Sequence, residues 1–171
     1  MTNVDQKAES VAHDLMQLTD QAKVYAARMR LLNTLDQADA LEATREIAAN
    51  LIGAEEVAIF KLDKKRSVLW LYWSFGIDPN RHAVLEVERE PRLAEVLAGK
   101  TIFRGDNGDA GLLSITDPAN ALIPIIVDGV TSAVLVLFRL VPHKSEFEPV
   151  DREICEVLSN CAGRAVEPQR V

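Results

Sequence analysis

The first 35 residues contain a long and regular repeat of apolar positions. From Val4 onward, apolar residues alternate between four-residue and three-residue steps, and no Gly or Pro interrupts residues 4–35. This heptad spacing is typical of a coiled-coil helix, in which one apolar stripe faces a partner helix. We therefore expect one long helix that pairs two copies of the chain, although the stripe could instead pack on the chain's own domain. The apolar stripe consists of Val4, Ala8, Val11, Leu15, Leu18, Ala22, Tyr25, Met29 and Leu32.

The length and composition fit one globular domain beyond this helix. The chain has 171 residues, of which 48% are hydrophobic and 26% are charged, which is enough for one sizeable core. The formal net charge of −7 disfavours a nucleic-acid partner, because an acidic surface repels phosphates. The sequence has neither a signal-peptide pattern nor an apolar run of membrane-spanning length, so we expect a cytoplasmic protein without membrane insertion.

Downstream of the apolar stripe, helical and strand-like segments follow one another. Segments rich in Val, Ile, Leu and aromatic residues are typical of strands, and Gly53 and Gly99 stand where helices are expected to end. This order indicates an α+β fold with a largely antiparallel sheet of about six strands. The expected elements are a helix over 39–52, a hairpin of strands over 56–62 and 68–75, a strand over 82–88, a short helix over 91–98, strands over 101–103, 121–127 and 130–140, and a closing helix over 145–166.

The strand region carries three more specific expectations. The strand over residues 68–75 is apolar on both faces, so we expect it to be central in a sheet that is covered on both sides. Asp128-Gly129 joins two hydrophobic strands and suits a type I′ hairpin turn. Residues 104–119 contain three glycines, three aspartates and one proline, which indicates a long loop and hence a candidate lid or binding segment.

Motifs for catalysis and metal binding are sparse. Residues 94–101, AEVLAGKT, resemble a phosphate-binding loop, but here a helix precedes Gly99, whereas such a loop follows a strand and opens a helix. The histidines His13, His82 and His143 lie in different elements, so we expect no metal site. Because no nucleophile, base and orienting group can be named together, we expect that the protein is not an enzyme.

The two cysteines belong to the closing helix. Cys155 and Cys161 are six residues apart, so at about 100° per residue their side chains point in different directions. They cannot pair within one helix, and we expect two reduced residues in or near the core.

A family resemblance rests on the last strands and the closing helix, NALIPIIVDGVTSAVLVLF and SEFEPVDREICEVLSNCAGRAV. A hydrophobic strand with Pro, an Asp-Gly turn, a second hydrophobic strand and an acid-started helix are similar to this part of GAF domains. Upstream, LDQADALEATREIAANLIGAEEVAIFKLD resembles the family's entry helix and first strand, and PRLAEVLAGKTIFRGD resembles its short helix and next strand. The resemblance covers residues 30–167.

The resemblance implies an architecture and a mode of assembly. It implies a GAF-like fold, with the N- and C-terminal helices on one face of the sheet and a pocket on the other. The chain then divides into a dimerisation helix over residues 1–35, a sensory domain over 36–167 and a tail over 168–171. Because GAF domains pair through their first and last helices, the expected interface adds Ile154, Val157 and Cys161 to the apolar stripe.

The expected pocket lies beside the sheet and the long loop. Each of the expected lining residues also has an alternative to lining the pocket: Trp73 and Phe75 could be core residues, and Arg104 and Asp106 could lie in a solvated loop. Of the ligands that GAF domains bind, cyclic nucleotides and bilins are not favoured, because the Asn-Lys-x-x-x-Phe-x-x-x-Asp-Glu signature and a mid-chain cysteine do not occur. No cofactor is assigned. The expected lining is Trp73, Phe75, His82, Arg104, Asp106, Asn107 and Ile115.

Two functional hypotheses follow. In the first, the chain is a homodimeric sensor in which a bound small molecule shifts the helical stalk, and a downstream signalling protein detects the shift. In the second, bulky residues such as Trp70 and Tyr72 fill the pocket, and the chain is a ligand-free dimerisation or adaptor module. A minor alternative is the GAF branch that reduces free methionine sulfoxide, although its cysteines surround the pocket loops rather than lying on the closing helix.

Overall fold

The helices of the computed structural model lie mainly at the two ends of the chain. The structure describes residues 2–80, 83–106, 111–114 and 119–167. A π-helical segment, Ile47–Ile52, continues the second helix, and short 3₁₀ turns occur at Val87–Arg89 and Gly163–Ala165. The α-helices within the described residues are α1 (Asn3–Leu32), α2 (Gln37–Glu46), α3 (Pro91–Leu97) and α4 (Pro149–Cys161).

One antiparallel sheet forms the centre of the domain. Its strands lie in the order β3-β2-β1-β6-β5-β4, and each neighbouring pair is antiparallel. This six-stranded sheet with its helices confirms the expected α+β, GAF-like fold. The strands are β1 (Val57–Asp63), β2 (Val68–Phe75), β3 (Val84–Glu86), β4 (Ile102–Phe103), β5 (Ala121–Val127) and β6 (Val130–Leu137).

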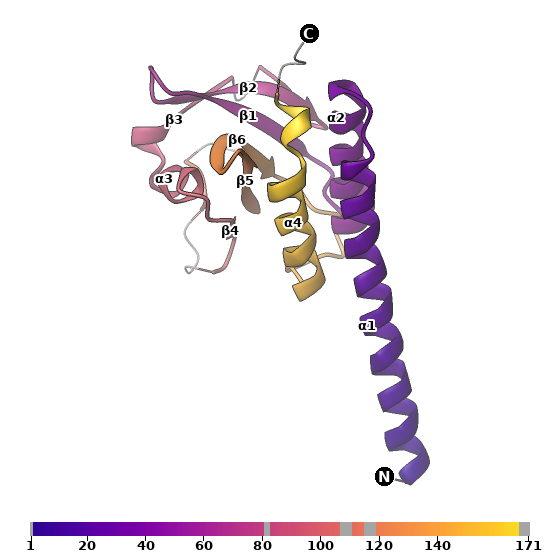
Figure 1. The fold of residues 1–171 in the computed structure, drawn as a ribbon. Helices are drawn as coiled ribbons and strands as arrows, with labels where there is room; N and C mark the ends of the chain where they lie inside the picture. The colour runs from indigo at the N-terminus through magenta and orange to yellow at the C-terminus, as the bar shows by residue number, and fades with distance from the viewer. Residues whose placement is uncertain (1, 81–82, 107–110, 115–118, 168–171) are drawn as a thin grey trace.

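The sheet separates two hydrophobic cores. Successive residues of a strand point to opposite faces, so Ile59 joins the core beneath α1, α2 and α4, whereas Phe60 joins the core beneath α3. Figure 1 shows α1, α2 and α4 on one side of the sheet and α3 on the other. The N- and C-terminal helices therefore share one face, and we call the two sides the helix side and the α3 side.

Strand β2 is less central than its apolar sequence indicates. It is the second strand from the sheet edge, and β3 pairs only with its first residues, from Val68 to Trp70. Trp70 and Phe75 expose 42% and 39% of their surface. The expected cover on both sides is nevertheless present in part, because Leu69 packs in the core on the α3 side and Trp73 packs on the helix-side core.

The turns and helix ends follow local sequence signals. Asp128 and Gly129 have φ angles of 50° and 77°, which confirms the positive angles that a type I′ turn requires. Helix α2 begins at Gln37, earlier than expected, because the Asp36 side chain accepts a hydrogen bond from the backbone N–H of Asp39 at 2.8 Å.

The closing helix α4 starts later than expected, at Pro149. Glu148 and Asp151 form a capping box, in which each side chain accepts a hydrogen bond from the other residue's backbone N–H. This motif satisfies exposed backbone donors and fixes the first turn. Strand β6 also ends earlier than expected, at Leu137. Residues 138–147 therefore connect β6 to α4 and belong to neither element, apart from one bridge between Leu140 and Ala54.

Candidate functional site

Helix α1 has one face that packs on the chain's own domain. Val24, Ala27 and Leu31 form this face, and Ala27 and Leu31 are buried in the helix-side core beside α4. The Arg30 guanidinium fixes this end of the helix, because it donates to the Asp39 carboxylate at 2.9 Å and to a second α2 carboxylate at 3.1 Å. At about 100° per residue, this face lies opposite the apolar stripe.

The apolar stripe points away from the domain. Its large side chains expose between 52% and 74% of their surface, with the exception of the half-buried Met29. Figure 1 shows that the N-terminal half of α1 extends well beyond the domain. The stripe therefore does not cover the chain's own core, and a continuous exposed apolar surface of this kind marks an interaction site. The exposed members are Val4, Ala8, Val11, Leu15, Leu18, Ala22, Tyr25 and Leu32.

The closing helix contributes differently from the expectation. Ile154 and Val157 are 0% and 4% exposed and belong to the helix-side core, so they have almost no surface to offer a second chain. Cys161 is half-buried and borders a cavity of about 270 Å³ between α1 and α4, together with Val24 and Arg28. In this structure, α4 faces α1 of its own chain.

Side chains fill the α3 side of the sheet. Phe60, Leu69 and Leu122 are completely buried there, and Leu93 from α3 packs against them. Leu112 and its neighbour Leu113 close the layer from the loop and are 5% and 7% exposed. Within the described residues, the protein's own hydrophobic side chains thus pack between the sheet and α3, and a cavity of about 730 Å³ borders this layer at α3, Leu112 and Leu113.

Trp73 and Phe75 lie on the other side of the sheet from this layer. Trp73 packs on the helix-side core, and the Phe75 ring lies 5.3 Å from the Arg45 guanidinium of α2. Neither residue lines the cavity beside Arg104 and Asp106. The other expected pocket residues, His82, Asn107 and Ile115, lie outside the described residues.

Arg104 and Asp106 are brought together at a cavity of about 760 Å³, near the start of α4. The Arg152 guanidinium donates to both Asp106 carboxylate oxygens, at 2.8 and 3.1 Å, and lies 4.3 Å from the Phe103 ring. The hydrogen bond from Arg152 holds the pKa of Asp106 below its usual value. The remaining lining comes from Gly105, Asn120, Leu140, Ser145, Glu146, Phe147 and Arg152.

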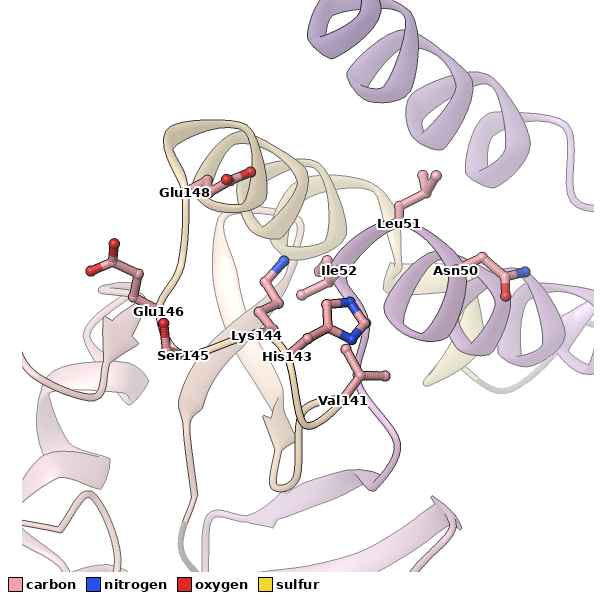
Figure 2. Close-up of a pocket in the computed structure, with 10 residues that line it drawn as sticks. Asn50, Leu51, Ile52, Val141, His143, Lys144, Ser145, Glu146 and Glu148 are labelled. Atoms are coloured by element: carbon pink, nitrogen blue, oxygen red, sulfur yellow. The ribbon is translucent and has the colours of Figure 1, made fainter.

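A second cavity, of about 390 Å³, lies beside the π-helical end of α2 (Figure 2). The Lys144 side chain extends from its wall towards α4, where the ammonium group donates to the buried Asp151 carboxylate at 2.7 Å. Asp151 also accepts from the backbone N–H of Glu148 at 2.8 Å. No pattern in the sequence indicated the Lys144–Asp151 ion pair, although the Glu148-x-x-Asp151 spacing is a capping signal that could have placed Asp151 at the start of the helix. The lining comprises Asn50, Leu51, Ile52, Gly53, Val141, His143, Lys144, Ser145, Glu146 and Glu148.

The cysteines lack the features of reactive thiols. Cys155 is fully buried, and this burial raises the pKa of its thiol to about 12, with a smaller effect from the nearby Asp151 carboxylate. Burial also raises the pKa of Cys161. Both thiols are therefore protonated near neutral pH, and a protonated thiol is a weak nucleophile.

Two kinds of feature do not occur in the described residues. Among residues 2–80, 83–106, 111–114 and 119–167, no group of three or more His, Cys, Asp or Glu side chains is arranged to hold a metal ion. In the same part of the chain, no helix has both the length and the apolar character that crossing a membrane requires.

Comparisons with known proteins identify the fold. No protein-family model and no curated protein matches the sequence. Among solved structures, the GAF domain of a phosphoenolpyruvate-protein phosphotransferase from Coxiella burnetii aligns with a TM-score of 0.66 and 15% identity, over 86% of this chain and 92% of that one. Residues 122 to 287 of a methyl-accepting chemotaxis protein align with a TM-score of 0.60 and 17% identity, over 82% and 94%.

An enzyme shares the same fold. The free methionine-R-sulfoxide reductase from Neisseria meningitidis aligns with a TM-score of 0.58 and 16% identity, over 85% of this chain and 89% of that one. At these identities the alignments establish the fold and leave the chemistry open. With its strand order, its N- and C-terminal helices on one face of the sheet and these structural relatives, the chain has a GAF-like fold with a long N-terminal helix.

Proposed function

We propose that this chain is a GAF-domain signalling protein that acts by binding, as a homodimer paired through α1, and not by catalysis. The observation that carries the proposal is the division of α1 into two faces. Val24, Ala27 and Leu31 hold the helix on its own domain, while the apolar stripe on the opposite face stays exposed. A helix with this heptad spacing is stabilised when a second helix covers its apolar face.

A partner protein fits the described residues better than a ligand in the sheet pocket. On the α3 side, Phe60, Leu69 and Leu93 occupy the space that a ligand would need. This packing supports the adaptor hypothesis, in which the dimer presents surfaces to a downstream signalling protein in the cytoplasm. The structural likeness to a chemotaxis protein is consistent with a signalling role.

The second candidate function is a small-molecule sensor that uses the cavity beside Arg104. That cavity combines Arg104, Asp106 and Asn120 with the ring of Phe147, and polar groups around an apolar wall are typical of ligand sites. The adjacent ion pair between Asp106 and Arg152 spans the loop and α4. A ligand that competes for either partner would couple this loop to the helix.

Reduction of free methionine sulfoxide is the least supported alternative. It requires a reactive cysteine near the substrate, whereas Cys155 belongs to the helix-side core and Cys161 lies between α4 and α1. The raised pKa of both thiols disfavours the thiolate that such chemistry uses.

The experiment that tests the proposal compares two double variants by sedimentation velocity. Leu15→Asp with Leu18→Asp places four charges in the paired stripe of a dimer and should produce monomers, because buried unpaired charges are very costly. Ser10→Asp with Gln17→Asp adds the same number of charges to the same part of α1, away from the stripe, and should leave the dimer intact. A dimer that survives the first pair of substitutions would overturn the proposed interface.

A further inference from the structure

We propose that the two α1 helices pair antiparallel, with Ala22 of one chain facing Leu18 of the other. This inference rests on the proposed homodimer and specifies its partner surface. The observations that carry it are the sizes of the residues along the apolar stripe, the charges that border the stripe, and the position of the domain on the back of the helix.

The sizes of the stripe residues favour an antiparallel alignment. In a parallel pair in register, each residue faces its own copy, so Ala8 would face Ala8 and Ala22 would face Ala22. Both layers would leave gaps, and protein interfaces of this type require close packing. In the antiparallel alignment every small residue meets a large one. The resulting layers are Ala8 with Leu32, Val11 with Met29, Leu15 with Tyr25, and Leu18 with Ala22.

The charges beside the stripe favour the same alignment. Asp14 and Arg28 precede stripe residues, and both are exposed. Asp14, Gln21 and Arg28 share one heptad position, directly before Leu15, Ala22 and Met29. In antiparallel pairs the residues at this position face one another across the two helices, so Asp14 of each chain meets Arg28 of its partner, and Gln21 meets Gln21. In a parallel pair the same Asp14 and Arg28 would face uncharged residues, Thr19 and Asn33. Opposite charges therefore meet twice in one alignment and not at all in the other.

The fold leaves room for this arrangement. The domain contacts α1 through Val24, Ala27 and Leu31, on the face opposite the stripe. Tyr25 and Leu32 remain 63% and 58% exposed alongside the domain. The projecting N-terminal half of the partner's α1 can therefore cover them without displacing any element of the domain (Figure 1).

The test measures the distance between two spin labels, one on each chain, at the exposed position of Gln6. The full-length variant carries Gln6→Cys with Cys161→Ser, while the fully buried Cys155 stays in place. Antiparallel pairing should separate the labels by about 40 Å, because about 28 residues at about 1.5 Å each lie between the two positions along the helix. Parallel pairing would bring them within about 20 Å, the span of two adjacent helices.

Each outcome has a distinct meaning. A distance near 40 Å supports the antiparallel pair, and a distance below 20 Å overturns it while leaving the homodimer intact. If no intermolecular distance is detected and sedimentation shows a monomer, both the alignment and the proposed homodimer are overturned.

A charge exchange provides a second test that does not depend on labels. Asp14→Arg places two pairs of like charges in the antiparallel dimer and should raise the dissociation constant of the dimer about tenfold. Adding Arg28→Asp to the same chain should restore the wild-type Kd, because the charges are then exchanged. If the second substitution fails to restore pairing, the two residues do not meet and the antiparallel alignment is wrong.

Discussion

Replacing Phe60 with alanine tests whether the α3 side of the sheet is filled. Phe60 is completely buried in that layer. A buried Phe removes about 150–250 Å² from water, and Phe→Ala changes in protein cores cost about 3–5 kcal/mol, including the cavity that they leave. We therefore expect Phe60→Ala to lower the free energy of unfolding by about 4 kcal/mol, a change of roughly 10³ in the unfolding equilibrium constant.

The matched control is Phe75→Ala, on the opposite face of the same sheet. Phe75 is 39% exposed, and its ring contacts the Arg45 guanidinium, so its loss should cost about 1 kcal/mol. Urea unfolding at one fixed protein concentration measures both variants, since the stability of a dimer depends on concentration. If Phe60→Ala costs no more than Phe75→Ala, the α3 side holds an open pocket and the adaptor hypothesis loses its main support.

Three further predictions concern the helix-side ion pair, the loop ion pair and the cysteines. Asp151→Asn should lower the free energy of unfolding by about 3 kcal/mol, measured by urea unfolding, and adding Lys144→Met should recover part of the loss, because the lysine charge is no longer left buried without a partner. The pKa of Asp106 is lowered in the folded state, so its ion pair with Arg152 contributes to the free energy of unfolding, by at most about 1 kcal/mol for such an exposed pair. This contribution is complete above the usual carboxyl pKa and is lost as pH falls through the lower folded pKa. Arg152→Gln should abolish this part of the acid dependence of stability, measured by urea unfolding at several pH values. Cys155 should react with a thiol reagent only after unfolding, so labelling of the folded chain at this residue would contradict its burial and its raised pKa.

Much of the fold could be predicted because local signals specify it. The hairpin at Asp128-Gly129 needs two positive φ angles, and few dipeptides supply them so readily. The long first helix follows from an unbroken heptad repeat. In contrast, the extent to which β3 pairs along β2 depends on a segment outside that strand, and no pattern within residues 68–75 carries that information.

The candidate sites were harder to predict, because they depend on whether a given face of a helix or strand is turned towards the chain's own domain or towards its surface. Apolar residues at three-to-four spacing indicate a buried helix face, but the spacing does not say whether the cover is another chain or the helix's own domain. For α1 the stripe faces outward, whereas Ile154 and Val157 of α4 face the chain's own core. Likewise, strict alternation along β2 would place Tyr72 and Trp73 on opposite faces, but both pack on the helix-side core, because the pairing of β1 with β2 shifts register beside them.

Native mass spectrometry of the intact protein, as isolated from cells, reports the number of subunits and any retained ligand in one spectrum. We expect a homodimer at twice the chain mass of 18.9 kDa, with no additional mass from a retained ligand. A dimer with a bound small molecule would favour the sensor hypothesis over the adaptor hypothesis. A monomer would contradict the proposed homodimer, because the apolar stripe of α1 would then lack the partner that it is proposed to bind.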